Sequence, residues 1–145
     1  MVAINENGPS ICEQQISMFE RTIEAKLSGE YRSFLLATNG GIPVSNLIEV
    51  DGLEGSPTDV QVFFGIGREV ESSDLKWNFC FIAERCPEFR LLPIACDSGG
   101  NLFCFRLREN AADEVVYCVL DTGECSLYPV AFTFGAFMKK LVQVT

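Results

Sequence analysis

The chain has 145 residues, of which 48% are hydrophobic, and its 20 acidic and 11 basic residues give a formal net charge of −9. This length and apolar content predict one globular domain over residues 1–145 and exclude a disordered chain. The acidic balance disfavours direct nucleic-acid binding, which depends on Lys and Arg contacts with phosphates. The chain has no histidine, which excludes an imidazole base or an imidazole metal ligand.

The N-terminal sequence and the cysteines predict a cytoplasmic location. The first residues lack the basic and apolar regions of a signal peptide, and the longest charge-free apolar stretch, 125–138, is shorter than the roughly 20 residues of a membrane-spanning helix. The seven cysteines include no Cys-x-x-Cys pair, which is typical of reduced, partly buried thiols; a zinc site or a catalytic disulfide is the less favoured alternative. We therefore expect no metal, no other cofactor and no membrane contact.

The first forty residues predict two helices. Apolar residues recur at helical spacing over 11–26, and Ser10 and Glu13 have the spacing of a capping box at its start. Ser28 predicts the N-cap of a second helix, which ends at the Asn-Gly-Gly of 39–41 because these residues accept the left-handed conformation that closes a helix. The apolar stripe of the first helix consists of Cys12, Ile16, Phe19, Ile23 and Leu27.

Short runs of β-branched and aromatic residues dominate the rest of the chain. They predict strands at 42–50, 60–66, 90–96, 102–107, 115–120 and 125–130. The segments 97–101 and 121–124 predict hairpin turns, and Pro129 is compatible only with an edge strand or a strand end. A third helix is predicted over 73–85, where alternating aromatic residues also allow a strand, and a fourth near the C-terminus is capped by Thr133. Helices at the N-terminus, the middle and the C-terminus around an antiparallel sheet give an α+β fold.

Several short motifs follow one another in a characteristic order. They are LSGEYRSFL at 27–35, NGG at 39–41, FGIG at 64–67, LPIACDSGGN at 92–101, and a terminal helix with Phe134 and Phe137. This series, from about residue 16 to residue 141, resembles the SUKH superfamily, which contains fungal cell-wall-assembly regulators and many bacterial immunity proteins. The resemblance implies an α+β fold and a non-catalytic role. Bacterial members typically bind and neutralise a toxin domain, often a nuclease.

Two glycine-containing motifs resemble chemical sites but have simpler interpretations. The Gly-Ile-Gly of 65–67 lacks the third glycine of a dinucleotide fingerprint, where Val70 stands, so a turn at a strand end is favoured. The segment 97–101 lacks the spaced acids of a calcium loop, so a hairpin turn is favoured. No Gly-x-Ser-x-Gly elbow occurs and no histidine base exists, so we expect no enzymatic activity; a small hydrolase with a cysteine or carboxylate site is the remaining alternative.

Acidic residues concentrate in the first half of the chain. Residues 1–72 hold eleven acids and four bases, and the segment 49–59 contains no base. These acids form either a solvated face that confers solubility or a negative patch for a basic partner. A nuclease is basic because it binds phosphates, so an acidic protein can cover the same surface. The candidate partner-binding acids are Glu49, Asp51, Glu54, Asp59, Glu69 and Glu71.

Trp77 and Phe81 are the candidate apolar contacts. They are one helical turn apart, opposite the stripe of Leu75, Phe79 and Ile82. A helix that is apolar on all sides is usually buried, but if this face is exposed, the two aromatic residues are anchors for a partner or for a second copy of the chain.

The residues and the resemblance together lead to one main hypothesis. The chain is a non-catalytic immunity protein, monomeric or homodimeric, that neutralises a basic toxin domain such as a nuclease by occluding its surface. The alternative from a different class is a regulatory interaction module with a housekeeping protein as its partner.

Overall fold

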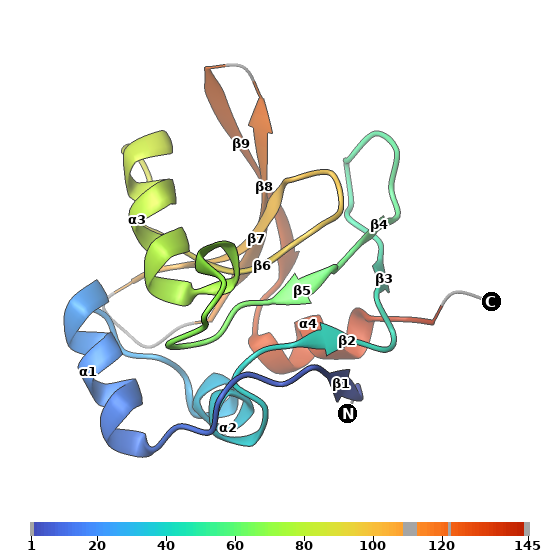
Figure 1. Cartoon of the computed structure of the whole chain (residues 1–145). Helices are drawn as coiled ribbons and strands as arrows, with labels where there is room; N and C mark the ends of the chain where they lie inside the picture. The colour runs from blue at the N-terminus through green and yellow to red at the C-terminus, as the bar shows by residue number, and fades with distance from the viewer. Residues whose placement is uncertain (1, 109–112, 122, 144–145) are drawn as a thin grey trace.

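A central antiparallel sheet organises the molecule (Figure 1), as seen in a computed structural model that describes residues 2–108, 113–121 and 123–143. Its strands lie in the order β5-β6-β7-β8-β9. They are β5 (Val62–Phe63), β6 (Leu91–Cys96), β7 (Leu102–Arg106), β8 (Val115–Asp121) and β9 (Glu124–Ala131). Two small antiparallel pairs accompany it, β1 (Ile4–Asn5) with β2 (Ile42–Pro43), and β3 (Leu47–Ile48) with β4 (Thr58–Asp59).

In the described residues, four α-helices pack around the sheet and complete an α+β fold, as predicted. They are α1 (Glu13–Ile23), α2 (Gly29–Ala37), α3 (Leu75–Arg85) and α4 (Phe134–Lys140), and a short 3-10 helix, η1 (Glu71–Ser73), precedes α3. Side-chain caps start three of them: Ser28 accepts a hydrogen bond from Tyr31 N, Asp74 from Trp77 N, and Thr133 from Ala136 N. These contacts confirm the predicted second, third and fourth helices, so the strand alternative for 73–85 is wrong.

The first helix begins later than the sequence predicted. Its N-cap is Cys12, whose backbone N–H donates a hydrogen bond to Gln15 Oε1 at 3.0 Å. The predicted capping box of Ser10 and Glu13 is therefore wrong. The same spacing occurs two residues further on, with a thiol in place of the hydroxyl and an amide in place of the carboxylate.

The first helix also ends earlier than predicted. Glu24 adopts the left-handed conformation, with φ of 54°, and closes the helix after Ile23. The buried carboxylate of Glu20 accepts hydrogen bonds from Leu27 N and from the Arg32 guanidinium, each at 2.7 Å. Residues 24–26 are thus not helical, although the apolar stripe predicted a further turn there, because Glu20 binds the backbone of Leu27 and the side chain of Arg32 in α2.

The predicted strands differ in how well they match the structure. The four long strands at 90–96, 102–107, 115–120 and 125–130 are confirmed to within one residue at each end. The predicted strand at 42–50 is instead two short strands with different partners, and the one at 60–66 is reduced to β5. Pro129 lies in β9, which ends the sheet, as predicted. The turn at 121–124 joins β8 to β9, with Thr122 outside the described residues.

An aromatic core fills one face of the sheet. The Tyr31 ring of α2 lies 4.7 Å from Phe105 of β7 and 5.1 Å from Phe134 of α4, measured between centroids. Phe103 pairs with Tyr117 across β7 and β8, and neighbouring side chains of a strand point to opposite faces. The next residue of β8, Cys118, therefore faces away from this core and toward α3.

The 97–101 hairpin is built around a buried carboxylate, which confirms the predicted turn. Asp97 Oδ1 accepts hydrogen bonds from Gly99 N at 3.0 Å and Asn101 N at 2.8 Å. Its Oδ2 accepts from Thr58 Oγ1 at 2.8 Å and from the Tyr117 hydroxyl. Burial and this bond raise the pKa of Tyr117 to about 12. The hairpin is thereby joined to β4 and β8.

The predicted helix end at 39–41 and the predicted turn at 65–67 lie against each other. Asn39 has a left-handed φ of 47°, and its buried side chain accepts a hydrogen bond from Ile66 N at 2.8 Å. A Cβ added at Gly65 would lie 2.1 Å from the Asn39 carbonyl oxygen. The glycine is therefore needed for close backbone approach, and the prediction of a turn without a nucleotide is consistent with this packing.

Candidate protein-binding surface

Helix α3 presents one side to the sheet and the other to solvent. Its start is fixed by Asp74, whose Oδ1 accepts hydrogen bonds from Gly67 N and Arg68 N and whose Oδ2 caps the helix. Leu75, Asn78 and Ile82 are buried against the rest of the molecule. The opposite side of the helix is therefore left for solvent or a partner.

Trp77 and Phe81 form a stacked pair on this outer side. Their ring centroids are 5.7 Å apart and the rings are nearly parallel, with an interplanar angle of 2°. Trp77 is 42% exposed and Phe81 is 37% exposed. The alternative in which this helix is buried on all sides is therefore wrong, and both predicted anchors are accessible in the isolated chain. We refer to Trp77 and Phe81 as the aromatic pair.

Two shallow grooves on the outer side of α3 are lined by the aromatic pair. One groove, of about 380 Å³, includes Trp77 and Cys80 and reaches the start of the helix. The other, of about 520 Å³, includes both rings and reaches Glu84. The aromatic pair thus borders hollows that a complementary partner can fill.

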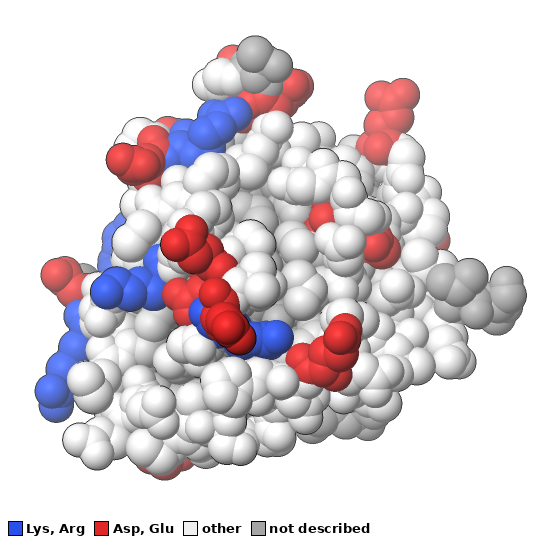
Figure 2. Space-filling view, in the orientation of Figure 1, with Lys and Arg blue, Asp and Glu red and all other residues white. Residues whose placement is uncertain are grey.

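The charges around the aromatic pair are mixed, with more acids than bases. Glu69 and Glu71 are exposed just before the helix, and Glu84 is exposed one turn after Phe81. Arg68 and Lys76 line the first groove. Figure 2 shows acidic side chains in separate groups on one face of the molecule, with uncharged surface between them and basic side chains beside the central group. We call the residues Arg68–Glu71, Lys76, Cys80, Glu84 and the aromatic pair the α3 surface.

The other predicted acids lie on a different part of the molecule. Glu49, Asp51 and Glu54 are exposed on the segment between β3 and β4, and we call these three the acidic loop. Asp59 is half-buried and accepts hydrogen bonds from the backbone and hydroxyl of Ser98, so it holds the neighbouring hairpin. Figure 1 shows α3 and the β3–β4 segment on opposite sides of the β8–β9 hairpin. The structure therefore brings Glu69 and Glu71 together with the aromatic pair and leaves the acidic loop apart.

Sequence reasoning missed several residues of the α3 surface. Glu84 lies three residues after Phe81 and seven after Trp77, a helical spacing that would have identified it. Val70 is 62% exposed between two acids, and no sequence signal distinguishes it from a buried valine. Lys76 and Arg68 carry the opposite charge to the predicted acidic patch, so the run of acids in the sequence did not indicate them.

A larger hollow lies elsewhere in the molecule. It has a volume of about 650 Å³ and lies between α2 and α4, where Phe34 and Phe134 form part of its wall. It contains no predicted site residue, and its apolar walls belong to the aromatic core.

The cysteines differ from their predicted state at one place. Cys86, at the end of α3, and Cys125, in β9, form a disulfide although 39 positions separate them. In this structure these two sulfurs are bonded, which differs from the reduced, partly buried thiols that the sequence favoured. The two cysteines meet because the end of α3 packs against β9. Their spacing in the sequence is not a Cys-x-x-Cys motif, so it did not predict this contact.

The buried free thiols are poorly suited to nucleophilic catalysis. Burial raises the pKa of Cys104, and it raises the pKa values of Cys96 and Cys118 to about 11. These groups are thus protonated at neutral pH, whereas a cysteine nucleophile must be a thiolate. This argues against a thiol hydrolase built on these three residues.

The family of this chain follows from a match to a known family model. The model of the SMI1 / KNR4 family (SUKH-1) matches residues 11–140. The chain belongs to this family. SUKH-1 membership confirms the resemblance seen in the motifs and supports a protein-interaction or immunity-type role, and SUKH proteins are generally non-catalytic. No curated protein sequence matches this SUKH-1 chain. Among the described residues, no helix has the length and apolar character needed to cross a membrane.

Proposed function

We propose that this SUKH-1 chain is a cytoplasmic immunity protein that binds a basic toxin domain, such as a nuclease, and occludes its working surface without catalysis. The observation that carries the proposal is the exposed, stacked pair of Trp77 and Phe81 beside Glu69, Glu71 and Glu84. Buried aromatic residues dominate the binding energy of protein interfaces, and flanking charges give register and orientation.

The aromatic pair offers enough apolar area to anchor a complex. With side chains of about 200 Å², the exposed fractions of 42% and 37% correspond to about 160 Å² that a partner can cover. At about 25 cal/mol per Å² this area contributes about 4 kcal/mol to binding. That contribution is comparable to the effect of one or two interface hot spots.

The acids supply the second part of the mechanism. With a net charge of −9, the molecule attracts a basic domain from a distance, and the α3 surface and the acidic loop are the two places where it could dock. The aromatic pair favours the α3 surface as the contact, with the acidic loop contributing to long-range attraction.

The proposal expects a toxin gene beside the gene of this chain, and the test titrates the toxin domain from such a gene with the purified protein by calorimetry. Trp77→Ala and Phe81→Ala are each expected to weaken binding by about tenfold or more. Phe132→Ala is the matched control, because Phe132 is 88% exposed and lies between β9 and α4, outside the α3 surface. Equal effects of all three variants, or none at all, would contradict the assignment of the interface.

Charge is tested separately through the rate of association. The on-rate is expected to fall as salt rises from about 10 to about 150 mM, since the screening length shortens from about 30 to about 8 Å. Glu71→Gln with Glu84→Gln should slow association and also speed dissociation, so their complex is weaker. Glu49→Gln with Glu54→Gln should slow association only. An on-rate that does not change with salt concentration would contradict the charge mechanism. Binding to a housekeeping protein and to no toxin domain would support the regulatory alternative.

A further inference from the structure

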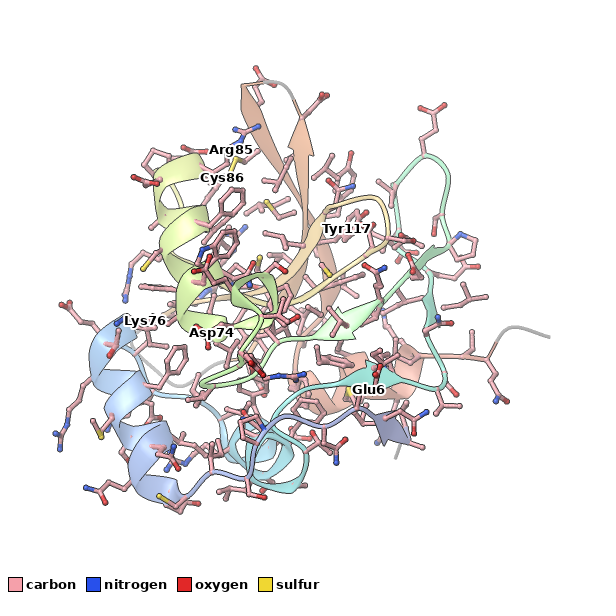
Figure 3. All side chains as sticks on the ribbon, in the orientation of Figure 1. Glu6, Asp74, Lys76, Arg85, Cys86 and Tyr117 are labelled. Atoms are coloured by element: carbon pink, nitrogen blue, oxygen red, sulfur yellow. A yellow bond between two sulfur atoms is a disulfide. The ribbon has the colours of Figure 1, made fainter. Side chains whose placement is uncertain are left out.

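Three cysteine sulfurs meet where the end of α3 lies against the β8–β9 hairpin. Cys86 comes from the helix end, Cys118 from β8 and Cys125 from β9, and their Sγ atoms all lie within 4.8 Å of one another. Cys86 and Cys118 are fully buried, and Cys125 is half-buried. Figure 3 shows Cys86 and its neighbour Arg85 at the end of the helix nearest that hairpin. We call Cys86, Cys118 and Cys125 the sulfur cluster.

The disulfide accounts for only two members of the sulfur cluster. Cys86 and Cys125 are bonded, and Cys118 is a free thiol beside them. In a reducing compartment such as the cytoplasm, the bridge opens and three thiols share one buried site. Soft thiolate sulfurs are the ligands that zinc and other thiophilic cations prefer.

The dimensions of the sulfur cluster suit a tetrahedral metal ion. Zinc–sulfur distances of about 2.3 Å place neighbouring ligand sulfurs about 3.8 Å apart. Cys118 Sγ, within 4.8 Å of the other two sulfurs, therefore needs to move by about 1 Å or less. The sulfurs of Cys86 and Cys125 must move apart by about 1.8 Å once their bond is reduced. Arg85 adds a favourable charge, because its Nη1 lies 3.9 Å from Cys125 Sγ and a zinc ion with three thiolates carries a net charge of −1.

We propose that the reduced sulfur cluster is a zinc-binding site. Reduction by a phosphine and one water breaks the S–S bond of Cys86 and Cys125, places a proton on each sulfur and leaves the oxygen on the phosphine. Zn²⁺ then forms three Zn–S bonds, and the three thiol protons go to solvent. The fourth tetrahedral position is left to water, since the chain has no histidine.

The test compares Zn²⁺ binding by the phosphine-reduced and the oxidised full-length protein, in competition with a chromogenic chelator. The reduced protein should bind one Zn²⁺ per chain, and the oxidised protein should bind far more weakly. Cys118→Ser should weaken binding to the reduced protein by about 100-fold or more, since even the loss of an outer-shell partner costs about 10–100-fold. Cys80→Ser is the matched control on the same helix, because Cys80 is exposed and outside the sulfur cluster.

A second probe keeps the test independent of folding defects. Cd²⁺ bound to thiolates gives an ultraviolet charge-transfer band, which Cys118→Ser should reduce by about one third because two of three ligands remain. The oxidised Cys118→Ser protein should retain the far-ultraviolet circular dichroism of the parent, since the disulfide does not involve that residue. Unchanged Zn²⁺ affinity in Cys118→Ser, equal losses in Cys118→Ser and Cys80→Ser, or equal binding by reduced and oxidised parent would each overturn the proposal.

Discussion

Removal of the Asp97 carboxylate is the sharpest test of how the sheet and its hairpins are held together. Asp97 is 4% exposed and accepts four hydrogen bonds, two from backbone N–H groups and two from hydroxyls. Asp97→Ala leaves the buried Tyr117 hydroxyl and the half-buried Asn101 N–H without their acceptor. Each such orphaned group costs about 1–3 kcal/mol, so we expect a loss of about 3 kcal/mol in the free energy of unfolding.

The measurement is urea denaturation at pH 7 with linear extrapolation, supported by thermal melting. A loss of about 3 kcal/mol corresponds to a melting temperature lower by about 9 °C in a chain of this size. Asp97→Asn should lose about 1 kcal/mol, because the amide oxygen can still accept the two backbone bonds. Asp51→Ala is the control, since Asp51 is an exposed acid of the acidic loop.

A double-mutant cycle separates this network from a general effect of removing a charge. Asp97→Ala and Tyr117→Phe should be coupled by about 1 kcal/mol or more, because each removes one end of the same buried hydrogen bond. A loss below about 1 kcal/mol for Asp97→Ala, or additive effects within about 0.3 kcal/mol, would refute the reasoning.

Two further predictions concern alkaline pH and close backbone packing. Burial and the bond to Asp97 raise the pKa of Tyr117 to about 12, so the stability that Tyr117 contributes is complete below the unfolded-state pKa of about 10 and is lost as pH rises through about 12. The melting temperature of the wild type should therefore fall more steeply than that of Tyr117→Phe between these pH values. Parallel curves of melting temperature against pH would contradict this prediction. Gly65→Ala should lose about 3 kcal/mol or more in urea denaturation, because its Cβ would meet the Asn39 carbonyl oxygen at 2.1 Å. Gly29→Ala, which has no neighbour within 4 Å, should instead gain about 0.4–1 kcal/mol, and a loss in both variants would show that the packing argument is wrong.

Local signals explain which parts of the fold could be predicted from the sequence. Ser28, Asp74 and Thr133 each cap a helix by accepting a hydrogen bond from the backbone N–H three residues later. Such local contacts depend only on nearby residues and can be predicted from the sequence. The four long strands were also predicted, because they are runs rich in apolar residues between turn residues. The length of α1 was not, since the contact of Glu20 with Arg32 that reshapes its end depends on the position of a second helix.

The candidate site shows the same division between local and tertiary information. Helical spacing placed Trp77 and Phe81 on one side of α3, but only the packing of Leu75 and Ile82 against the sheet decides that this side is exposed. The six predicted acids are close together in the sequence, yet the fold places two on the α3 surface, three on the acidic loop and the sixth, Asp59, against the 97–101 hairpin. The bond of Cys86 to Cys125 spans 39 positions and could not be predicted from spacing.

The edge strand β9 affects the tendency of this protein to aggregate. An uncovered strand of eight residues normally offers a ladder of free backbone groups on which another chain can grow. In β9, Pro129 removes one of those N–H groups, the register shift opposite Val115 and Val116 bends the strand, and Glu124 places a charge near its start. The free edge of β9 is therefore a poor template for strand addition by another chain. Contacts between copies of this protein should be made by side chains.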